Sequence, residues 1–286
     1  MNQWHNTSVF SVVTAVLLTL SSCVHKDQTI KMKGSDTEVN LAVNLAEHFS
    51  KDNQDFSIAI SGGGSGLGIT AILNNQADIA NSSRPLTSEE IQLFKEKNIE
   101  LRTVVFAEDA TAFVVHKDNP IDEIDLKTLG EILDGTQISW NTVAGIDLPV
   151  NIYGRQSSSG TFSFVRKKLK IDFSPSSKEM TGNAQILEGV KIDKSGIGYV
   201  GAGYIAANAG ANQGIKVLKI IDDSNPIAIS PLDKEAIRGN KYFFQRPLYQ
   251  FIPEKSWHKV APFINFEKAA EGKKLIEQSG YYVLDK

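Results

Sequence analysis

The sequence from residue 155 to residue 161 is Arg155-Gln156-Ser157-Ser158-Ser159-Gly160-Thr161, and it decides how the rest of the chain is interpreted. Residues 149–153 before it alternate apolar and polar side chains, as a strand does, and residues 162–169 after it can form a helix. A strand-to-helix turn directs the free N–H groups of the first helical turn, and the positive end of the helix dipole, toward whatever lies in front of it. The stretch therefore predicts an anion site, although a solvent-facing turn can have the same composition.

The side chains of this stretch suit a tetrahedral oxyanion. The hydroxyls of Ser159 and Thr161 are hydrogen-bond donors, and Gly160 lets the backbone come close to a ligand. The guanidinium of Arg155 is a planar fork that can donate to two oxygens of one anion. We therefore predict that these four residues bind an oxyanion.

The composition restricts the class of partner. The chain has 286 residues with 41% hydrophobic side chains, which is enough for one or two domains with a large core. Its net charge of −3 gives no basic field for nucleic acid, so an anion would be bound by local hydrogen bonds. Cys23 is the single cysteine, which excludes disulfides within the chain, and we expect no metal and no cofactor.

The first residues are typical of an exported lipoprotein. Residues 9–20 form an apolar run that is shorter than the roughly 20 residues of a membrane span. The run ends in Leu20-Ser21-Ser22-Cys23, which resembles a bacterial lipobox, although residues 1–8 lack the basic residue that a signal peptide usually has. We expect residues 1–22 to be a signal peptide and Cys23 to carry a lipid.

The same order of strand, Ser- or Gly-rich turn and helix occurs four times in the sequence. The other three turns are residues 34–37, 62–66 and 82–85, each between a strand pattern and a helical pattern. Strands that alternate with helices predict parallel α/β sheets, in which ligands bind at the carboxyl ends of the strands. Four turns could thus surround one anion, although Asp36 or Thr37 could instead be a helix N-cap.

Enzymatic interpretations find less support in the sequence. The turn at residues 62–66 lacks the lysine of a P-loop, the spacing of a dinucleotide fingerprint and the second glycine of a nucleophile elbow. A serine hydrolase that used Ser159 or Ser65 would need a general base. The histidines are scattered along the chain at His5, His25, His48, His116 and His258. We therefore expect a protein that is not an enzyme, with a hydrolase as the remaining alternative.

Arg155 followed by Ser159-Gly160-Thr161 resembles the Arg-x-x-x-Ser-Gly-Thr signature of the phosphate-binding proteins of bacterial ABC phosphate importers. Further similar segments occur in the family's order along nearly the whole chain after Cys23: Gly34-Ser35-Asp36-Thr37, Gly64-Ser65-Gly66, Asp78-Ile79-Ala80-Asn81-Ser82-Ser83-Arg84-Pro85-Leu86, Trp140-Asn141, Thr181-Gly182-Asn183, Gly196-Ile197-Gly198-Tyr199-Val200 and Arg246-Pro247-Leu248-Tyr249. The resemblance implies a two-lobed α/β fold of the type II periplasmic binding proteins, with phosphate in the cleft between the lobes. It also implies that residues 27–110 and 245–286 form one lobe and residues 111–244 the other.

The resemblance transfers the family's ligand contacts to particular positions. Some family members have, in the fourth turn, an aspartate that accepts the proton of hydrogen phosphate, where this chain has Ser83 followed by Arg84. We assign the acceptor role to Asp36 instead, and we expect poor discrimination against sulfate if no acid fills it. The expected phosphate-binding residues are Ser35, Asp36, Thr37, Ser65, Ser83, Arg84, Arg155, Ser159, Gly160 and Thr161.

The resemblance further implies the partners and the location of the protein. We expect a monomer that delivers phosphate to the permease subunits of an ABC transporter. It would lie in the periplasm or at the outer face of the cell envelope, anchored to the membrane through the lipid on Cys23. Two alternatives within the same fold are a site for another oxyanion and a sensory role.

Overall fold

The computed structural model describes residues 29–208, 210, 213–223 and 225–283. The expected signal peptide and Cys23 lie outside the described residues. Within the described part of the chain, no helix is both long enough and apolar enough to cross a membrane.

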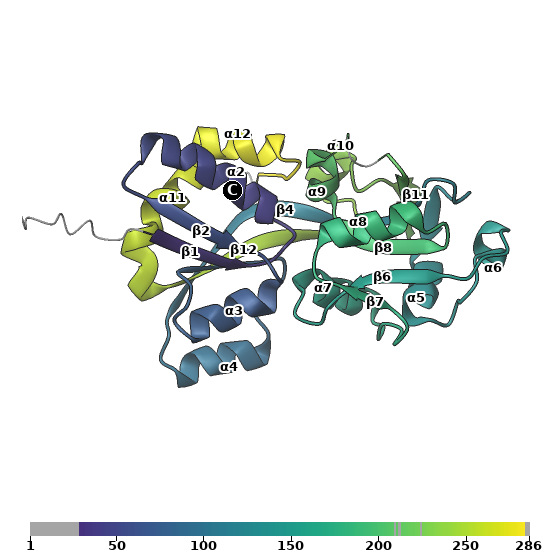
Figure 1. Cartoon of the computed structure of the whole chain (residues 1–286), viewed down its shortest axis with the longest axis horizontal. Coiled ribbons are helices and arrows are strands. Elements are labelled where there is room, and N and C mark those ends of the chain that lie inside the picture. The colour runs from purple at the N-terminus through teal and green to yellow at the C-terminus, as the bar shows by residue number, and fades with distance from the viewer. Residues whose placement is uncertain (1–28, 209, 211–212, 224, 284–286) are drawn as a thin grey trace, which may run out of the picture.

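Strands and helices alternate along most of the chain (Figure 1). The strands are β1 (Thr29–Gly34), β2 (Ser57–Ser61), β3 (Ile79–Ser82), β4 (Leu101–His116), β5 (Glu123–Asp125), β6 (Asn151–Arg155), β7 (Lys178–Met180), β8 (Gly196–Gly201), β9 (Ile215–Val217), β10 (Lys219–Asp222), β11 (Asn225–Ile229) and β12 (Gln245–Pro253). The helices are α2 (Val39–Asp52), α3 (Ser65–Leu73), α4 (Ser88–Glu96), α5 (Leu126–Asp134), α6 (Asn141–Ala144), α7 (Gly160–Leu169), α8 (Asn183–Ile192), α9 (Ala202–Ala207), α10 (Lys234–Arg238), α11 (Trp257–Lys268) and α12 (Ala270–Gln278), with a 3-10 turn η2 (Glu254–Ser256).

The long strand β4 belongs to both halves of the molecule. Its first part pairs with β12, from Leu101 opposite Pro253 to Ala110 opposite Gln245. Its second part, starting at Thr111, pairs with β8 instead. We call residues 29–110 and 245–283 lobe 1 and residues 111–244 lobe 2, because the pairing of β4 changes between Ala110 and Thr111 (Figure 1).

Each lobe has its own hydrophobic core. In lobe 1, α2, α11 and α12 cover one face of the sheet, and α3 and α4 lie on the other (Figure 1). Phe49 of α2 packs edge to face against Phe263 of α11, with ring centroids 5.4 Å apart. In lobe 2, the core includes Phe113 of β4, whose ring centroid lies 4.8 Å from that of Phe244. Burial of these apolar faces is the main source of stability for both lobes.

The sheet is mixed, whereas the sequence pattern predicted parallel sheets. Strands β1, β2 and β3 pair in parallel, as do β6, β7 and β8, in agreement with the strand-turn-helix pattern. The exceptions are β4 and β12, which run antiparallel to each other, and each of them pairs antiparallel with a strand of the parallel sets. These two strands carry the chain between the lobes.

Local capping signals agree with the structure. Thr87 and Glu90 form a capping box at the start of α4, where they exchange side-chain and backbone hydrogen bonds, as the spacing of Thr and Glu predicts. Helix α12 ends at Gln278, and Gly280 after it has a φ of 83°, a conformation that glycine commonly adopts after a helix.

Candidate functional site

The stretch at residues 155–161 forms the predicted strand-to-helix turn. Strand β6 ends at Arg155, and α7 begins at Gly160. Ser159 is the N-cap of α7, and its hydroxyl accepts a hydrogen bond from the N–H of Phe162 at 3.3 Å. Because the first N–H groups of α7 have no partner within the helix, this end is suited to an anion.

Arg155 is almost completely buried although it carries a charge. Its side chain is 2% exposed, and burial lowers the pKa of its guanidinium from the ordinary value. Nη2 donates to the carbonyl oxygen of Thr181 at 3.1 Å, and Nη1 donates to Oδ1 of Asn183 at 3.4 Å. Nε has no hydrogen-bond partner, so this buried cation keeps unused donor capacity.

The turns of lobe 1 contribute buried hydroxyls to the same place. Ser65, at the start of α3, accepts a hydrogen bond from the N–H of Ser83 at 3.1 Å. The Ser35 hydroxyl, which follows β1, donates to the Ser83 hydroxyl at 3.2 Å. All three serines are buried, so three of the four turns lie together.

The turn of lobe 2 meets those of lobe 1 directly. A Cβ atom added to Gly160 would lie 2.2 Å from Oγ of Ser65 and 2.5 Å from Oγ of Ser83. The hydroxyl oxygens of Thr37 and Thr161 are 3.0 Å apart. All four predicted turns therefore converge, and only glycine fits at position 160 without displacing a hydroxyl.

Arg246 joins this group from β12. Its Nη2 donates to Thr37 at 3.2 Å and to Thr161 at 3.1 Å, so one guanidinium contacts both lobes. The same Nη2 pairs with Asp109 at 3.0 Å. Burial raises the pKa of the Asp109 carboxyl above its ordinary value, and the charge of Arg246 opposes that shift. We call the following residues the anion cluster: Ser35, Thr37, Ser65, Ser83, Arg155, Ser159, Gly160, Thr161 and Arg246.

Asp36 lies at the edge of the anion cluster and links the two lobes. Its Oδ2 accepts a hydrogen bond from the N–H of Asn183 at 2.8 Å and lies 3.9 Å from Nη1 of Arg155. Its backbone carbonyl accepts a second bond from the Asn183 amide at 3.2 Å. This carboxylate therefore already has partners in lobe 2.

Arg84 is not brought into the anion cluster. Its guanidinium donates to both carboxylate oxygens of Glu90, at 2.7 Å each. Glu90 is also the capping residue of α4, so Arg84 is held at the start of that helix. The second guanidinium of the anion cluster is that of Arg246, to which the sequence analysis assigned no role.

Sequence reasoning also missed three other polar residues beside the anion cluster, namely Asp109, Asn183 and Glu38. Asn183 lies in the Thr-Gly-Asn segment and Arg246 in the Arg-Pro-Leu-Tyr segment, so the resemblance held a signal for both. Asp109 lies inside a long apolar strand, and nothing in its neighbourhood distinguishes it from a surface acid.

Further contacts between the lobes show that the molecule is closed. The N–H of Gly66 donates to the carbonyl oxygen of Ser158 at 2.9 Å. The Gln156 amide donates to the carbonyl oxygen of Gly63 at 2.6 Å. These bonds hold the first turn of α3 against the turn before α7, beside the anion cluster.

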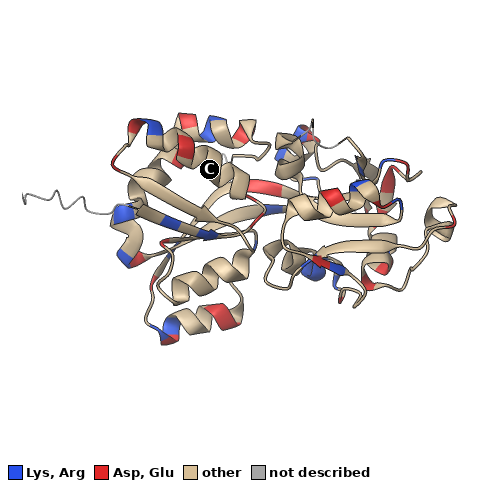
Figure 2. Cartoon of the chain, in the orientation of Figure 1, with Lys and Arg blue, Asp and Glu red and all other residues tan. Residues whose placement is uncertain are grey.

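Charges outside the cluster give no field of one sign. Figure 2 shows Lys and Arg interspersed with Asp and Glu over both lobes.

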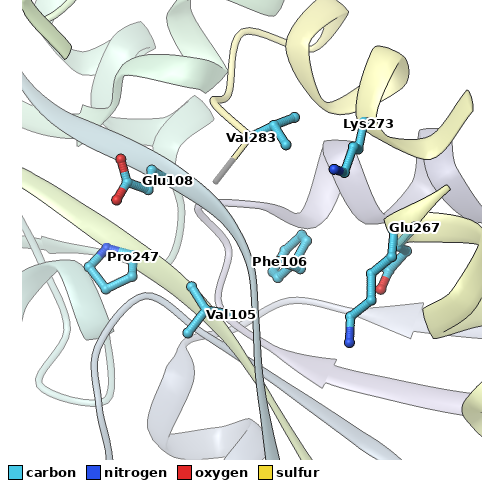
Figure 3. Close-up of a pocket in the computed structure, with 8 residues that line it drawn as sticks. Val105, Phe106, Glu108, Pro247, Glu267, Lys273 and Val283 are labelled. Carbon is cyan, nitrogen blue, oxygen red and sulfur yellow. The ribbon is translucent and has the colours of Figure 1, made fainter. Parts of the chain in front are cut away.

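A pocket of about 660 Å³ lies away from the anion cluster, in lobe 1. It is lined by Val105, Phe106, Glu108, Pro247, Glu267, Lys268, Lys273 and Val283 (Figure 3). The convergent hydroxyls and buried arginines thus distinguish the anion cluster from the rest of the molecule.

The fold and this cluster define a two-lobed binding protein, and comparison with known proteins identifies its family. The chain belongs to the PBP superfamily, whose domain matches residues 24–272. It is 30% identical over 257 residues to the phosphate-binding protein PstS of Staphylococcus aureus (strain USA300), which covers 88% of this chain and 77% of that protein. It is 26% identical over 274 residues to the protein SphX of Synechococcus elongatus, which covers 92% of this chain and 80% of that protein.

Solved structures show the same architecture. A putative phosphate ABC transporter substrate-binding protein from Clostridium perfringens, solved with bound phosphate, has a TM-score of 0.79 at 23% identity and covers 90% of this chain and 100% of its own. An ABC-type phosphate transport receptor from Vibrio cholerae has a TM-score of 0.68 at 25% identity and covers 89% of this chain and 100% of its own. The expected type II periplasmic-binding fold is confirmed.

Proposed function

We propose that this protein binds inorganic phosphate between its two lobes and delivers it to an ABC transporter for uptake. The observation that carries the proposal is the convergence of two arginines, each only 2% exposed, with hydroxyls from both lobes on one place. Such donors in a buried site suit a small anion with several oxygens. PstS of Staphylococcus aureus is a phosphate-binding protein, and the two solved structures are of a putative phosphate ABC transporter substrate-binding protein and an ABC-type phosphate transport receptor.

The strength of these donors is sufficient for tight binding. A hydrogen bond to a charged group contributes about 1.5–3 kcal/mol, and micromolar binding needs about 8 kcal/mol in total. A few good contacts therefore suffice after the costs of desolvation. Because the donors belong to both lobes, a bound anion favours the closed state, which a transporter can recognise.

The proposed contacts are those of the anion cluster, with Arg246 in the role first given to Arg84. The division into lobes 1 and 2 at residues 110–111 and 244–245 is part of the proposal, and the change in pairing of β4 supports it. Asp36 keeps its role as the proposed acceptor of the phosphate proton. Its Oδ2 accepts a hydrogen bond from the Asn183 N–H, and the carboxylate keeps further acceptor capacity for the phosphate proton.

The site supports binding over hydrolysis. The Ser65 hydroxyl accepts from the Ser83 N–H, and the Ser159 hydroxyl accepts from the Phe162 N–H. Among the described residues, no histidine hydrogen-bonds to either serine. We infer that the protein is not an enzyme but acts as a monomer outside the cytoplasm, in the periplasm or at the outer face of the envelope. There it would be held by a lipid on Cys23 and contact permease subunits.

Thermal unfolding with a panel of oxyanions tests the proposal. A ligand that binds only the folded state raises its stability by about 2.7 kcal/mol at a concentration 100 times its Kd. We expect phosphate to raise the melting temperature most, molybdate and methylphosphonate less, and sulfate hardly at all. No shift with phosphate would overturn the proposed function. Equal shifts with phosphate and sulfate would remove Asp36 from its proposed role.

A further inference from the structure

Glu38 is a buried acid beside the anion cluster that the proposed binding mode does not use. It precedes α2, directly after Thr37, and its side chain is 0% exposed. Neither of its carboxylate oxygens has a hydrogen-bond partner. Buried carboxyl groups without a partner are rare, so this one requires an explanation.

The groups that act on the Glu38 carboxyl come from all sides of the cluster. On the turn before α2 it faces the Ser35 hydroxyl, on β12 the Arg246 guanidinium and on β4 the Asp109 carboxyl. From lobe 2, the Arg155 guanidinium interacts electrostatically with the Glu38 carboxylate. Tyr281, after α12, also interacts electrostatically with the Glu38 carboxylate. The Tyr281 hydroxyl donates to the carbonyl oxygen of Thr37 at 2.6 Å.

This setting favours the neutral form of Glu38. Burial is the main cause that raises the pKa of the Glu38 carboxyl, which is about 8. The charge of Arg246 opposes this shift, and the charge of Asp109 adds to it. A protonated carboxyl has an O–H donor, so a neutral Glu38 resembles the hydroxyls around it more than it resembles Asp36.

The charges of the site agree with a proton on Glu38. When Glu38 is neutral, the two cations Arg155 and Arg246 are balanced by Asp36 and Asp109. When Glu38 ionises, the same volume holds three carboxylates against two guanidinium groups, and an incoming anion is repelled. The state of this one acid therefore decides whether the local charge is zero or negative.

We propose that Glu38 holds a proton in the anion site, that this proton and the anion bind together, and that Glu38 acts as a hydrogen-bond donor of the site. This inference rests on the proposed function, since phosphate is the anion used to test it. The site would then contain two acids with different roles. Glu38 would donate a hydrogen bond to the anion, and Asp36 would accept the proton of the phosphate.

The coupling has a definite sign. A bound anion raises the pKa of a neighbouring acid, so Glu38 takes up a proton when phosphate binds at a pH near or above the pKa of its free form. Near pH 8, about half of the Glu38 side chains are ionised before binding, so about half a proton is taken up per anion through this residue. Above that pH, Glu38 must take up a proton before the anion binds. This requirement lowers the association constant for phosphate by about tenfold per pH unit.

Isothermal titration calorimetry with inorganic phosphate tests this coupling. Titrations near pH 8 in buffers of different ionisation enthalpy give the number of protons taken up per anion. We compare wild type with Glu38→Gln, which keeps a donor but cannot titrate. The matched control is Glu267→Gln, because Glu267 is also fully buried with a pKa raised to about 8 but lies on α11, away from the anion cluster.

We expect proton uptake to fall by about half a proton in Glu38→Gln and to stay at the wild-type value in Glu267→Gln. Above pH 8, the Kd of wild type should rise faster with pH than that of Glu38→Gln. Equal proton uptake in wild type and Glu38→Gln would overturn the inference. If Glu38→Gln does not fold, Glu38→Met is compared with wild type in the same way. Wild type alone also tests the inference, because absence of any proton uptake near pH 8 would overturn it. A wild-type protein that does not bind phosphate would instead overturn the proposed function.

Discussion

Arg246 and Asp109 form an ion pair of 3.0 Å in which the two side chains are 1% and 0% exposed. Asp109 lies on β4 just before the strand passes into lobe 2, and Arg246 lies opposite it on β12. The pair therefore fixes Arg246 at the boundary between the lobes, where its guanidinium reaches Thr37 and Thr161.

Removing one partner of this pair should be costly. Arg246→Met leaves Asp109 buried without a counter-charge, so we expect a loss of about 3–5 kcal/mol in the free energy of unfolding, measured by urea denaturation. The double variant Arg246→Met/Asp109→Asn should lose less than the sum of the two single variants, because it removes both charges. Strictly additive losses would contradict this coupling.

Arg155→Ala should weaken phosphate binding at least tenfold. The change removes charge-assisted hydrogen bonds of about 1.5–3 kcal/mol each, which corresponds to a Kd about ten to a hundred times higher. Calorimetry measures this Kd. Arg166→Ala is the matched control, because Arg166 lies on the exposed side of α7, paired with Asp172, and should bind like wild type. Unchanged affinity in Arg155→Ala would contradict the proposed site.

Gly160→Ala should weaken binding by displacing hydroxyls at the interface of the lobes. The new methyl group would lie 2.2 Å from Oγ of Ser65, so this side chain and that of Ser83 must rotate away or the lobes must separate. We expect about a tenfold rise in Kd, together with a larger radius of gyration by X-ray scattering in the presence of phosphate. Gly130→Ala on α5 is the control, since its Cβ would meet nothing nearer than Ile171 at 3.8 Å. Equal behaviour of the two variants would argue against direct contact of the turns in the closed state.

Glu267→Gln should change how stability depends on pH. Burial raises the pKa of the Glu267 carboxyl from 4.5 to about 8 in the folded chain. Between these two pH values the folded chain keeps a proton that the unfolded chain has lost, so Glu267 lowers stability as pH rises through this window. In this pH window, the free energy of unfolding of Glu267→Gln should therefore rise relative to that of wild type by up to about 1.4 kcal/mol per pH unit.

The measurement for Glu267→Gln is the free energy of unfolding in urea at a series of pH values. The advantage of the variant should level off below the unfolded pKa and again above the folded one. Glu271→Gln, on the exposed side of α12, is the control and should run parallel to wild type. An advantage of Glu267→Gln that does not change with pH would contradict burial as the cause.

Local patterns predicted much of the fold because they depend on residues close in sequence. The alternation before Arg155 and the glycine-rich turn before Ser65 each produced the expected strand, turn and helix. The strand β7 lies in a polar stretch of the sequence, residues 172–183, whose pattern predicts a loop. It is three residues long and lies at the edge of the sheet, so it has no apolar alternation to reveal it.

The structure pairs Arg84 with Glu90 and brings Arg246 into the anion cluster, and this difference from the expected site has a physical cause. Arg84 is adjacent to Ser83 in the sequence, which suggested that both face the anion. Glu90, within the first turn of α4, captures its guanidinium locally. Arg246 reaches the same region only because β12 pairs between β3 and β4, a placement set by tertiary structure rather than by neighbouring residues.

The strands β4 and β12, which join the two lobes, pass beside the anion cluster. The chain passes between the lobes through hydrogen-bonded strands, with the N–H of Thr111 donating to the carbonyl oxygen of Phe244 at 3.0 Å, so opening requires these strands to flex rather than a loose tether to swing. Because Arg246 and Asp109 lie on these two strands, an anion bound as proposed would act close to the connection between the lobes. A small displacement at that connection would produce a larger displacement at the far ends of the lobes, which is how binding of a small ion could change the surface presented to a transporter.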